Sequence, residues 1–331
     1  MLDERELLPV WYGGRAPGLE LRLLSFAYGL VSGLRRLLHA ARLLPRRRLP
    51  VPVIVVGNIT VGGTGKTPLV IALVQALRAR GFNPGVISRG YAGSADAPLL
   101  VDAQSDPARV GDEARLIFDA TNAPVCVARD RHAAGEKLLG AARVDVIVAD
   151  DGLQHYKLCR NVEICVIDGE RRFGNGRLLP AGPLREPVNR LEKVDFRVWN
   201  GGVARAGDVT MTLRGDVAVG VTDAQQRRPL HSFVVQRVHA VAGIGNPQRF
   251  FAQLRAAGIE IVEHAFPDHH PFCAADLDFG DDLDVLMTSK DAVKCRAFAQ
   301  PRHWQVPVEA QLPPAFLDAV ADALKKVRVG D

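Results

Sequence analysis

The sequence predicts an α/β protein with a doubly wound, mostly parallel sheet, a second and smaller α/β domain, and an N-terminal amphipathic helix. Three observations support this prediction. Short β-branched runs alternate with helical patterns between residues 51 and 200, which is typical of βαβ units. A stretch with weaker strand patterns follows, and a second alternation of strand-like and helix-like runs begins near residue 236. Before residue 51, apolar side chains recur at helical spacing.

The large domain, residues 51–200, has strand-like runs at 51–57, 84–90, 124–128, 144–150, 162–168 and 195–200. Helical patterns lie between several of them, at 67–80, 112–120 and 131–142. Crossover helices place neighbouring strands parallel. Ligands of such sheets gather beyond the carboxyl ends of the strands, so we expect the functional residues there.

The remainder divides into a connector and a smaller domain. Residues 201–235 carry weaker strands and polar turns, and we expect a β-ribbon linker there. Residues 236–331 alternate strand-like and helix-like patterns again, which predicts a smaller C-terminal α/β domain. The sequence shows no internal repeat of fixed period and no low-complexity tract.

Residues 1–50 form a basic, amphipathic segment. Its longest uncharged run, Leu23 to Leu34, has 12 residues, too short for a conventional span of about 20. Polar residues recur at helical spacing from Arg22 to His39, and leucines cover much of the remaining surface. One interpretation is an interfacial helix that contacts a membrane surface through residues 19–48. The alternative is a helix packed by its apolar face on the protein's own core.

Composition and charge exclude several classes. The chain has 331 residues, of which 47% are hydrophobic and 24% charged, as expected of a folded protein. The net charge is +5, and the first 50 residues hold nine arginines against four acids, so no general nucleic-acid surface is indicated. Five cysteines without a C-x-x-C pair argue against a disulfide scaffold or a zinc ribbon and suit a reducing compartment.

A glycine-rich turn joins the strand at 51–57 to the helix that follows it. The pattern resembles a Walker loop that ends in Gly-Lys-Thr, with threonine at the first position in place of glycine. Backbone amides and the helix N-terminus can close around phosphate oxygens. The predicted nucleotide-binding residues are Thr60, Val61, Gly62, Gly63, Thr64, Gly65, Lys66 and Thr67. The fold expected is therefore that of a P-loop NTPase.

Two carboxylates follow the strand at 144–150. Asp150 and Asp151 can hold Mg²⁺ beside the phosphate loop, together with the Thr67 hydroxyl. No Asn-Lys-x-Asp element for reading guanine is present, so we expect ATP as the nucleotide. Without the upstream loop, the same aspartates would serve equally well as a turn or a helix cap.

Histidines cluster in the stretch "HAFPDHHPF", which holds His264, Asp268, His269 and His270. The cluster could supply a general base oriented by a carboxylate, bind a metal, or form an ordinary polar loop. We rank the base above the metal because no second His/Cys cluster completes a structural metal site.

Other candidate residues stand at strand ends and helix starts. Asp112 and Glu113 open a predicted helix, where capping alone would explain them. Tyr91 follows a strand end and could contact a ring or an anion. Arg185 and Glu186 lie in a proline-braced loop, where the arginine could face a phosphate or pair with its neighbour.

Together these stretches resemble one family, the tetraacyldisaccharide 4'-kinases, which are the lipid A 4'-kinases of Gram-negative bacteria. The matching stretches are "GNITVGGTGKTP", "SRGY", "VGDE", "DDGLQ", "GPLREP", "FPDHHPF" and "KDAVKC". They occur in the family's order between about residues 50 and 295, and the family's loop also has threonine at the first Walker position. The chain departs from the family at Ser289, where the family commonly has glutamate, and at Leu153, where phenylalanine is more usual.

The resemblance implies ATP-dependent phosphorylation of the 4'-hydroxyl of tetraacyldisaccharide 1-phosphate at the cytoplasmic face of the inner membrane. It implies two α/β units that close on each other, and His269 as a general base assisted by Asp112. Lys66 and Thr67 would bind ATP and Mg²⁺, supported by Asp150 and Asp151. Further candidates are Gln154 near the phosphate site, Glu113 as a metal ligand, and Tyr91, Arg185 and Glu186.

Two other functions fit the residues. A soluble small-molecule or nucleotide kinase would use residues 19–44 as a core helix. A P-loop ATPase acting as a switch or metallochaperone would bind a transition metal at the histidine cluster. Neither nucleic acid nor an obligate protein partner is indicated.

Overall fold

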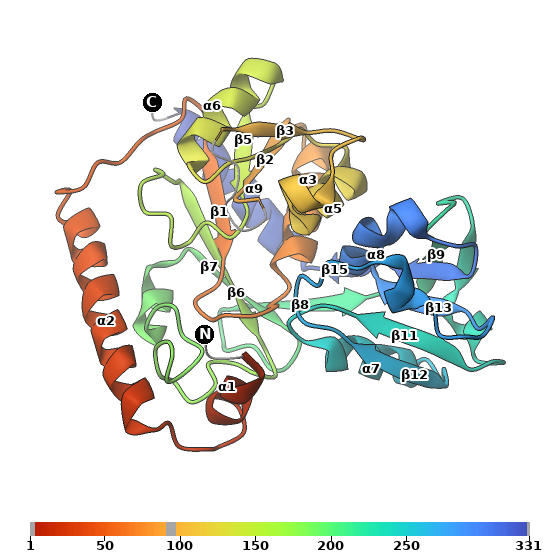
Figure 1. Cartoon of the computed structure of the whole chain (residues 1–331). Coiled ribbons are helices and arrows are strands. Elements are labelled where there is room, and N and C mark those ends of the chain that lie inside the picture. The colour runs from red at the N-terminus through yellow and green to blue at the C-terminus, as the bar shows by residue number, and fades with distance from the viewer. Residues whose placement is uncertain (1–3, 91–96, 330–331) are drawn as a thin grey trace.

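The computed structural model describes residues 4–90 and 97–329, arranged around two separate sheets (Figure 1). The larger sheet has nine strands and the smaller has six. Strands and helices alternate in both, as the sequence predicts, and the α/β fold class is confirmed.

The larger sheet has the strand order β15-β8-β7-β6-β1-β5-β2-β4-β3. All neighbours pair in parallel except at the two edges, where β3 and β15 run antiparallel. Its strands are β1 (Val53–Gly57), β2 (Pro84–Ser88), β3 (Leu99–Val101), β4 (Val125–Val127), β5 (Val146–Ala149), β6 (Val162–Asp168), β7 (Phe196–Asn200), β8 (Val209–Arg214) and β15 (Glu309–Gln311). The buried central strands are continuous runs of valine and isoleucine, as expected where both faces are covered.

Helices cover both faces of this sheet. One face packs against α3 (Lys66–Ala79), α5 (Asp112–Thr121) and α9 (Pro314–Val329). The other packs against α6 (Arg131–Ala141) and the long segment from 153 to 194, which includes the 3₁₀ helix η2 (Val188–Lys193). The short helix α4 (Pro107–Val110) leads into α5. The phosphate loop therefore lies at the carboxyl edge of a sheet that is covered on both sides.

The smaller sheet has the order β10-β9-β14-β13-β11-β12. Its strands are β9 (Val217–Gly220), β10 (Arg227–Pro229), β11 (Val238–Ala242), β12 (Ile261–Ala265), β13 (Val285–Thr288) and β14 (His303–Val306). Helix α7 (Pro247–Ala256) packs on one face, where Phe251 and Leu254 are buried. Helix α8 (Ser289–Cys295) covers the other. Three further 3₁₀ helices complete it: η3 (Leu230–Phe233), η4 (Ala274–Leu277) and η5 (Arg296–Phe298).

The chain crosses between the sheets twice, and here the structure differs from the predicted boundaries. Strand β8, inside the predicted linker, belongs to the larger sheet, whereas β9 and β10 belong to the smaller one. Residues 309–329, which the sequence assigned to the smaller domain, return to the larger sheet as β15 and α9. Short apolar runs show the type of an element, but the sheet that it joins depends on long-range pairing. The two crossings lie side by side, since β15 pairs with β8.

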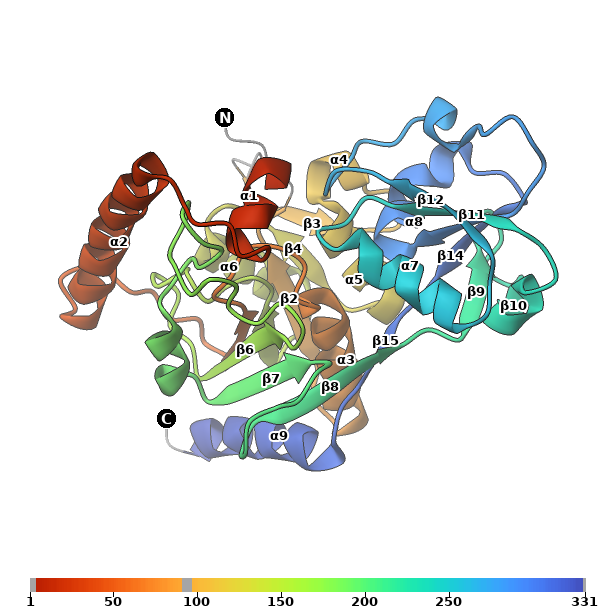
Figure 2. The same ribbon diagram turned by 90° about the horizontal axis from the view of Figure 1, so that it is seen from below.

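The N-terminal helices lie beside the larger unit, and α2 (Leu19–Ala40) stands on the side of the molecule opposite the smaller sheet (Figures 1 and 2). Helix α1 (Glu4–Trp11) packs with Leu7, Val10 and Trp11 in a small cluster of its own. Among the described residues, no helix is both long and apolar enough to cross a membrane.

Helix α2 turns its polar side towards the protein. The Ser25 hydroxyl donates to the Leu178 carbonyl at 2.8 Å, and the Tyr28 hydroxyl donates to the Arg185 carbonyl at 2.9 Å. Gly29 permits close approach, because a Cβ there would lie 3.1 Å from Leu178. The large apolar residues point outwards instead, with Leu23, Leu24, Phe26, Leu30, Val31, Leu34 and Leu37 between 54% and 71% exposed. The alternative of a helix packed by its apolar face on the core is therefore wrong.

We predict that Leu324→Ala lowers the free energy of unfolding by about 2–5 kcal/mol, because it leaves a cavity between α9 and the larger sheet. Leu324 is fully buried in that core. The control is Lys325→Ala, an exposed position on the same turn, which should change stability by less than about 0.5 kcal/mol. Urea unfolding measures both. Equal effects would contradict the packing of α9 on this sheet.

Candidate active site

The conformation of the phosphate loop depends on its glycines and on a contact with β7. It leaves β1 at Gly57 and enters α3 at Lys66, and Gly62 and Gly65 adopt φ angles of 97° and 93°, which favour glycine. The Asn200 side chain, at the end of β7, donates to the Thr64 carbonyl at 3.0 Å. A Cβ on Gly65 would lie 2.4 Å from that same amide nitrogen, so only glycine fits there.

The loop is also fixed on its outer side. Thr60 pairs with Leu184 as an isolated bridge, and the Val61 amide donates to the Pro183 carbonyl at 2.8 Å. These bonds tie it to the proline-braced "GPLREP" stretch. The predicted role of that stretch as part of the site thus has a backbone basis that the sequence did not show.

Lys66 is positioned among oxygens at the base of the loop. Its ammonium lies 3.3 Å from the Asn58 side-chain oxygen and 3.5 Å from an Asp151 oxygen. Thr67, half-buried, occupies the first turn of α3, where unpaired helix amides attract phosphate. Asn58, which the sequence did not single out, also accepts through its carbonyl a bond from Gln154 at 3.0 Å.

Asp150 is completely buried just after β5. Neither of its carboxylate oxygens has a hydrogen-bond partner within the described part of the chain. Burial, together with the charges of Glu113 and Asp151, raises the pKa of Asp150 to about 7. A buried carboxylate without a donor fits a cation ligand. In the described ranges no three His, Cys, Asp or Glu side chains group to hold a metal, so an ion here would need ligands from nucleotide phosphates or water.

Asp151 behaves differently although it is the next residue. It adopts a φ of 46° and points at Arg185, whose guanidinium lies 3.0 Å away. Burial would raise the pKa of Asp151, but the charges of Lys66 and Arg185 outweigh it and hold the pKa well below its usual range. Asp151 is therefore an ionised counter-charge that connects the phosphate lysine to the "GPLREP" arginine.

The predicted pair of Asp112 and His269 meets across the two units. Asp112 is the first residue of α5, and His269 follows β12 with a φ of 59°. The His269 Nδ1 atom lies 3.0 Å from a carboxylate oxygen of Asp112, which is buried. This hydrogen bond is the main cause that raises the pKa of His269, while burial opposes it. Burial would raise the pKa of Asp112, but the bond and the charges of Lys290 and Lys294 lower it.

Lys290 completes the cluster, and sequence reasoning missed it. Its ammonium lies 3.1 Å from Glu113, 3.2 Å from Asp268 and 3.5 Å from Nε2 of His269. Burial would lower the pKa of Lys290, but the charges of Glu113, Asp112 and Asp268 raise it well above its usual range. The only signal in the sequence was its place in the stretch "KDAVKC", where the preceding residue, Ser289, opens α8.

The other predicted residues are distributed as follows. His264 contacts His239 at 2.9 Å, and His270 contacts Asp276 at 3.1 Å, so only Asp268 and His269 of that cluster reach the site. Glu186 is buried and accepts a hydrogen bond from the Tyr156 hydroxyl. Tyr91 lies outside the described residues.

The loop after β11 brings the smaller unit against the phosphate loop. A Cβ built on Gly245 would lie 2.9 Å from the Gly63 amide nitrogen and 3.4 Å from an Asp268 oxygen. Arg171 of the larger unit donates to the Gly245 carbonyl at 3.0 Å. The glycine therefore allows the phosphate loop and the histidine-bearing segment to adjoin.

Comparison with known proteins identifies the family of the chain. The family described as Tetraacyldisaccharide-1-P 4'-kinase matches residues 18–325. A protein of Stenotrophomonas maltophilia named Tetraacyldisaccharide 4'-kinase is 53% identical over 329 residues, covering 97% of each chain. A protein of the same name from Methylobacillus flagellatus is 49% identical over 318 residues, covering 96% of this chain and 95% of the relative.

A solved structure shares the fold. The crystal structure of an "apo" form of LpxK from Aquifex aeolicus in complex with ATP has a TM-score of 0.76 and 26% identity, covering 92% of this chain and 97% of that one. With a family match across most of the chain and relatives at about half identity, the chain belongs to the tetraacyldisaccharide 4'-kinase family, whose members are kinases that phosphorylate a sugar hydroxyl.

Proposed function

We propose that this chain transfers the γ-phosphate of ATP to the 4'-hydroxyl of tetraacyldisaccharide 1-phosphate in lipid A synthesis. Family membership supports the reaction class. The observation that carries the mechanism is the Asp112–His269 contact, which places an oriented imidazole on the smaller unit beside a phosphate loop on the larger one. A carboxylate that orients an imidazole in this way suits it to act as a general base for a hydroxyl.

The phosphate side of the site uses the larger unit. The loop amides and the N-terminus of α3 would hold the phosphate chain, and Lys66 would balance its charge. Asp150 fits Mg²⁺ because its carboxylate is buried and receives no hydrogen bond from the described residues. Thr67 would be a second ligand, with Asp151 and Glu113 as further candidates. When bound, Mg²⁺ would neutralise charge on the β- and γ-phosphate oxygens.

The acceptor side uses His269. Neutral imidazole accepts the proton of the 4'-hydroxyl at Nε2, the sugar oxygen bonds to the γ-phosphorus, and ADP departs as the leaving group. Asp112 fixes the ring through Nδ1 and stabilises the imidazolium that forms. Because base and phosphate loop belong to different units, closure assembles the site and limits hydrolysis before the acceptor binds.

The exposed apolar side of α2 supports placement at the cytoplasmic face of the inner membrane. Moving an acyl chain out of a bilayer costs about 0.8 kcal/mol of free energy per CH₂, so the enzyme has to reach its acceptor at the interface. Eight large apolar side chains of α2 are exposed, and exposed arginines follow at 42 and 46–48. A soluble kinase with α2 as a core helix would bury those side chains.

We predict that the protein phosphorylates the 4'-oxygen of tetraacyldisaccharide 1-phosphate in mixed micelles, and that His269→Ala lowers this rate by about 100-fold or more while ATP still binds. The product is located by mass spectrometry and NMR. His270→Ala is the matched control, because that side chain turns to Asp276. Absence of product from ATP-binding protein would refute the acceptor, and equal rates in both variants would refute the base.

We predict that Asp112→Asn moves the acidic limb of kcat/KM to lower pH and reduces its plateau. The imidazole acts as a base only when neutral, so the rate falls as pH drops through the pKa of His269. Asp112 raises that pKa, and its loss lowers it. An unchanged limb would mean that His269 does not set the pH dependence.

We predict that Leu30→Glu weakens binding to vesicles and raises the KM for micellar acceptor, because it places a charge on the outward face of α2. The control is Val235→Glu, an 88% exposed valine between η3 and β11 of the smaller unit, which should bind vesicles as the unmodified chain does. Vesicle co-sedimentation measures both. Equal binding by the two variants would exclude α2 as the membrane contact.

A further inference from the structure

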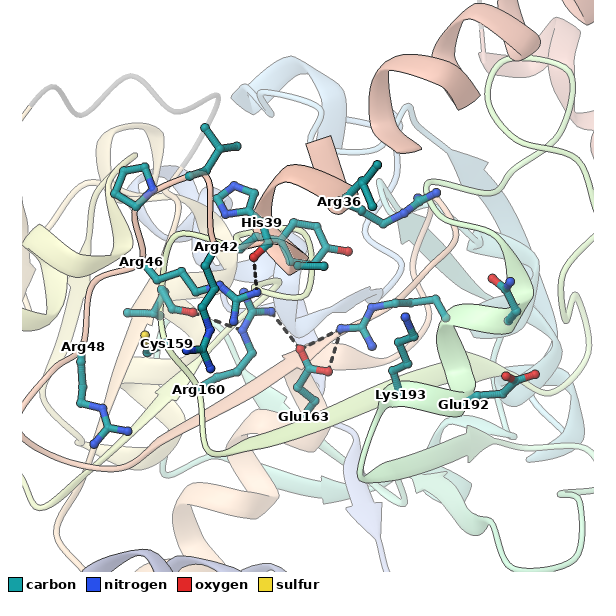
Figure 3. A pocket seen from close by; sticks show the side chains of 18 of the residues that line it. Arg36, His39, Arg42, Arg46, Arg48, Cys159, Arg160, Glu163, Glu192 and Lys193 are labelled. Atoms are coloured by element: carbon teal, nitrogen blue, oxygen red, sulfur yellow. Dashed lines mark hydrogen bonds and ion pairs between the residues drawn. The ribbon is translucent and has the colours of Figure 1, made fainter. Parts of the chain in front are cut away.

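A cavity of about 1000 Å³ opens between the end of α2, the segment that follows it, and η2 (Figure 3). The catalytic proposal uses none of the residues that line it. Leu37, His39 and Arg42 approach from one side, and Asn189 and Lys193 from the other. It therefore requires an explanation of its own.

The charge in this cavity is strongly positive. Seven arginine or lysine residues line it, against two glutamates. One of these, Glu163, is already shared by two guanidinium groups, at 3.1 Å from Arg160 and 2.7 Å from Arg190 (Figure 3). Like charges gathered around one cavity repel each other, and an anion bound among them would relieve that repulsion.

Several buried polar atoms in the cavity wall lack hydrogen-bond partners among the described residues. Within the described part of the chain, the buried Nη1 atoms of Arg36 and Arg190 have no hydrogen-bond partner, and neither has Nδ1 of His39. His39 is 1% exposed and Arg190 is 8% exposed. Buried polar groups of native proteins are almost always paired, and a guanidinium pairs best with a carboxylate or phosphate. These atoms mark a place for an anionic ligand.

The mouth of the cavity continues into an apolar surface. Leu37 lines the cavity and is 64% exposed, and Leu43, in the segment that follows α2, is 71% exposed. Both belong to the outward-facing apolar side of the N-terminal segment. A ligand that fills the cavity with an anionic group would therefore rest hydrocarbon on these leucines, which is the chemistry of an anionic lipid.

The cavity lies away from the phosphate loop. Glu163, in the cavity wall, pairs with Val55, and the phosphate loop begins three residues after Val55, at Asn58. Glu163 and the start of the loop are therefore roughly 10 Å apart along the strand. On α2, Arg36 and His39 follow Tyr28, which bonds to Arg185 of the catalytic side, by roughly 12–16 Å along the helix axis. A ligand held here does not occupy the place of the transferred phosphate.

We propose that this cavity binds the phosphate of an anionic bilayer glycerophospholipid, a second lipid that is distinct from the phosphorylated acceptor. Arg36 and Arg190 donate to the phosphate oxygens, and the acyl chains lie along Leu37 and Leu43. The inference rests on the proposed membrane placement, but not on the catalytic assignment. The proposal differs from a general attraction of basic residues to a membrane, because it predicts one saturable binding site.

The experiment titrates the full chain, held in neutral detergent, with short-chain phosphatidylglycerol by calorimetry. We expect one saturable site per chain, and no such site for phosphatidylcholine of the same chain length. Arg36→Gln should weaken binding about tenfold or more, since it removes a charged donor. Lys193→Gln removes a charge from the opposite wall and should also weaken binding. The matched control is Arg22→Gln, with the same charge change on the exposed surface of α2 outside the cavity, and should alter affinity less than about threefold.

Other outcomes would overturn the proposal. Equal losses from Arg22→Gln and Arg36→Gln would show diffuse surface attraction. Inorganic phosphate binding as tightly as the lipid would show a simple anion site. A raised KM for the acceptor in Arg36→Gln, measured without anionic lipid, would assign the cavity to the acceptor's own phosphate. The calorimetric titration measures binding without catalysis, so its result can be interpreted even if the proposed kinase reaction fails.

Discussion

The hydrogen bond between Asp112 and His269 is the interaction on which the rest of the arrangement depends. It joins the first residue of α5 on the larger sheet to the loop after β12 on the smaller one. Once those units meet, Lys290 has two carboxylates and an imidazole within reach, and Gly245 lies against the phosphate loop. Without it, each unit holds half of a site: a phosphate cradle on one, a base on the other.

The sequence predicts those elements whose chemistry is local. The phosphate loop follows from glycines between a strand and a helix, and Asp150 follows from its place at the end of a strand. Periodicity cannot predict contacts made over long separations. His269 and His270 are equivalent as sequence, and only the fold turns one to Asp112 and the other to Asp276. Lys290 is likewise one lysine among many until packing surrounds it with acids.

Helix α2 shows the same limit in another form. Its periodicity predicts a polar side and an apolar side, but not which one faces the protein. Ser25, Tyr28 and Gly29 answer that question through specific contacts with residues 178–185, the same stretch that fixes the phosphate loop. The helix thus packs against the same residues that hold the phosphate loop in place. Its apolar side is left free because the polar side is the one that binds the core.

The double crossing between the sheets has a consequence for how the chain folds during synthesis. Strands β9 to β14 and their helices form one uninterrupted stretch, from 217 to 306, and can complete their core as soon as that stretch leaves the ribosome. The larger unit cannot. Its edge strand β15 and its covering helix α9 are made last, so Val320 and Leu324 close a core whose first strand began at Val53. The nucleotide-binding unit, although it starts first, is the last to be finished.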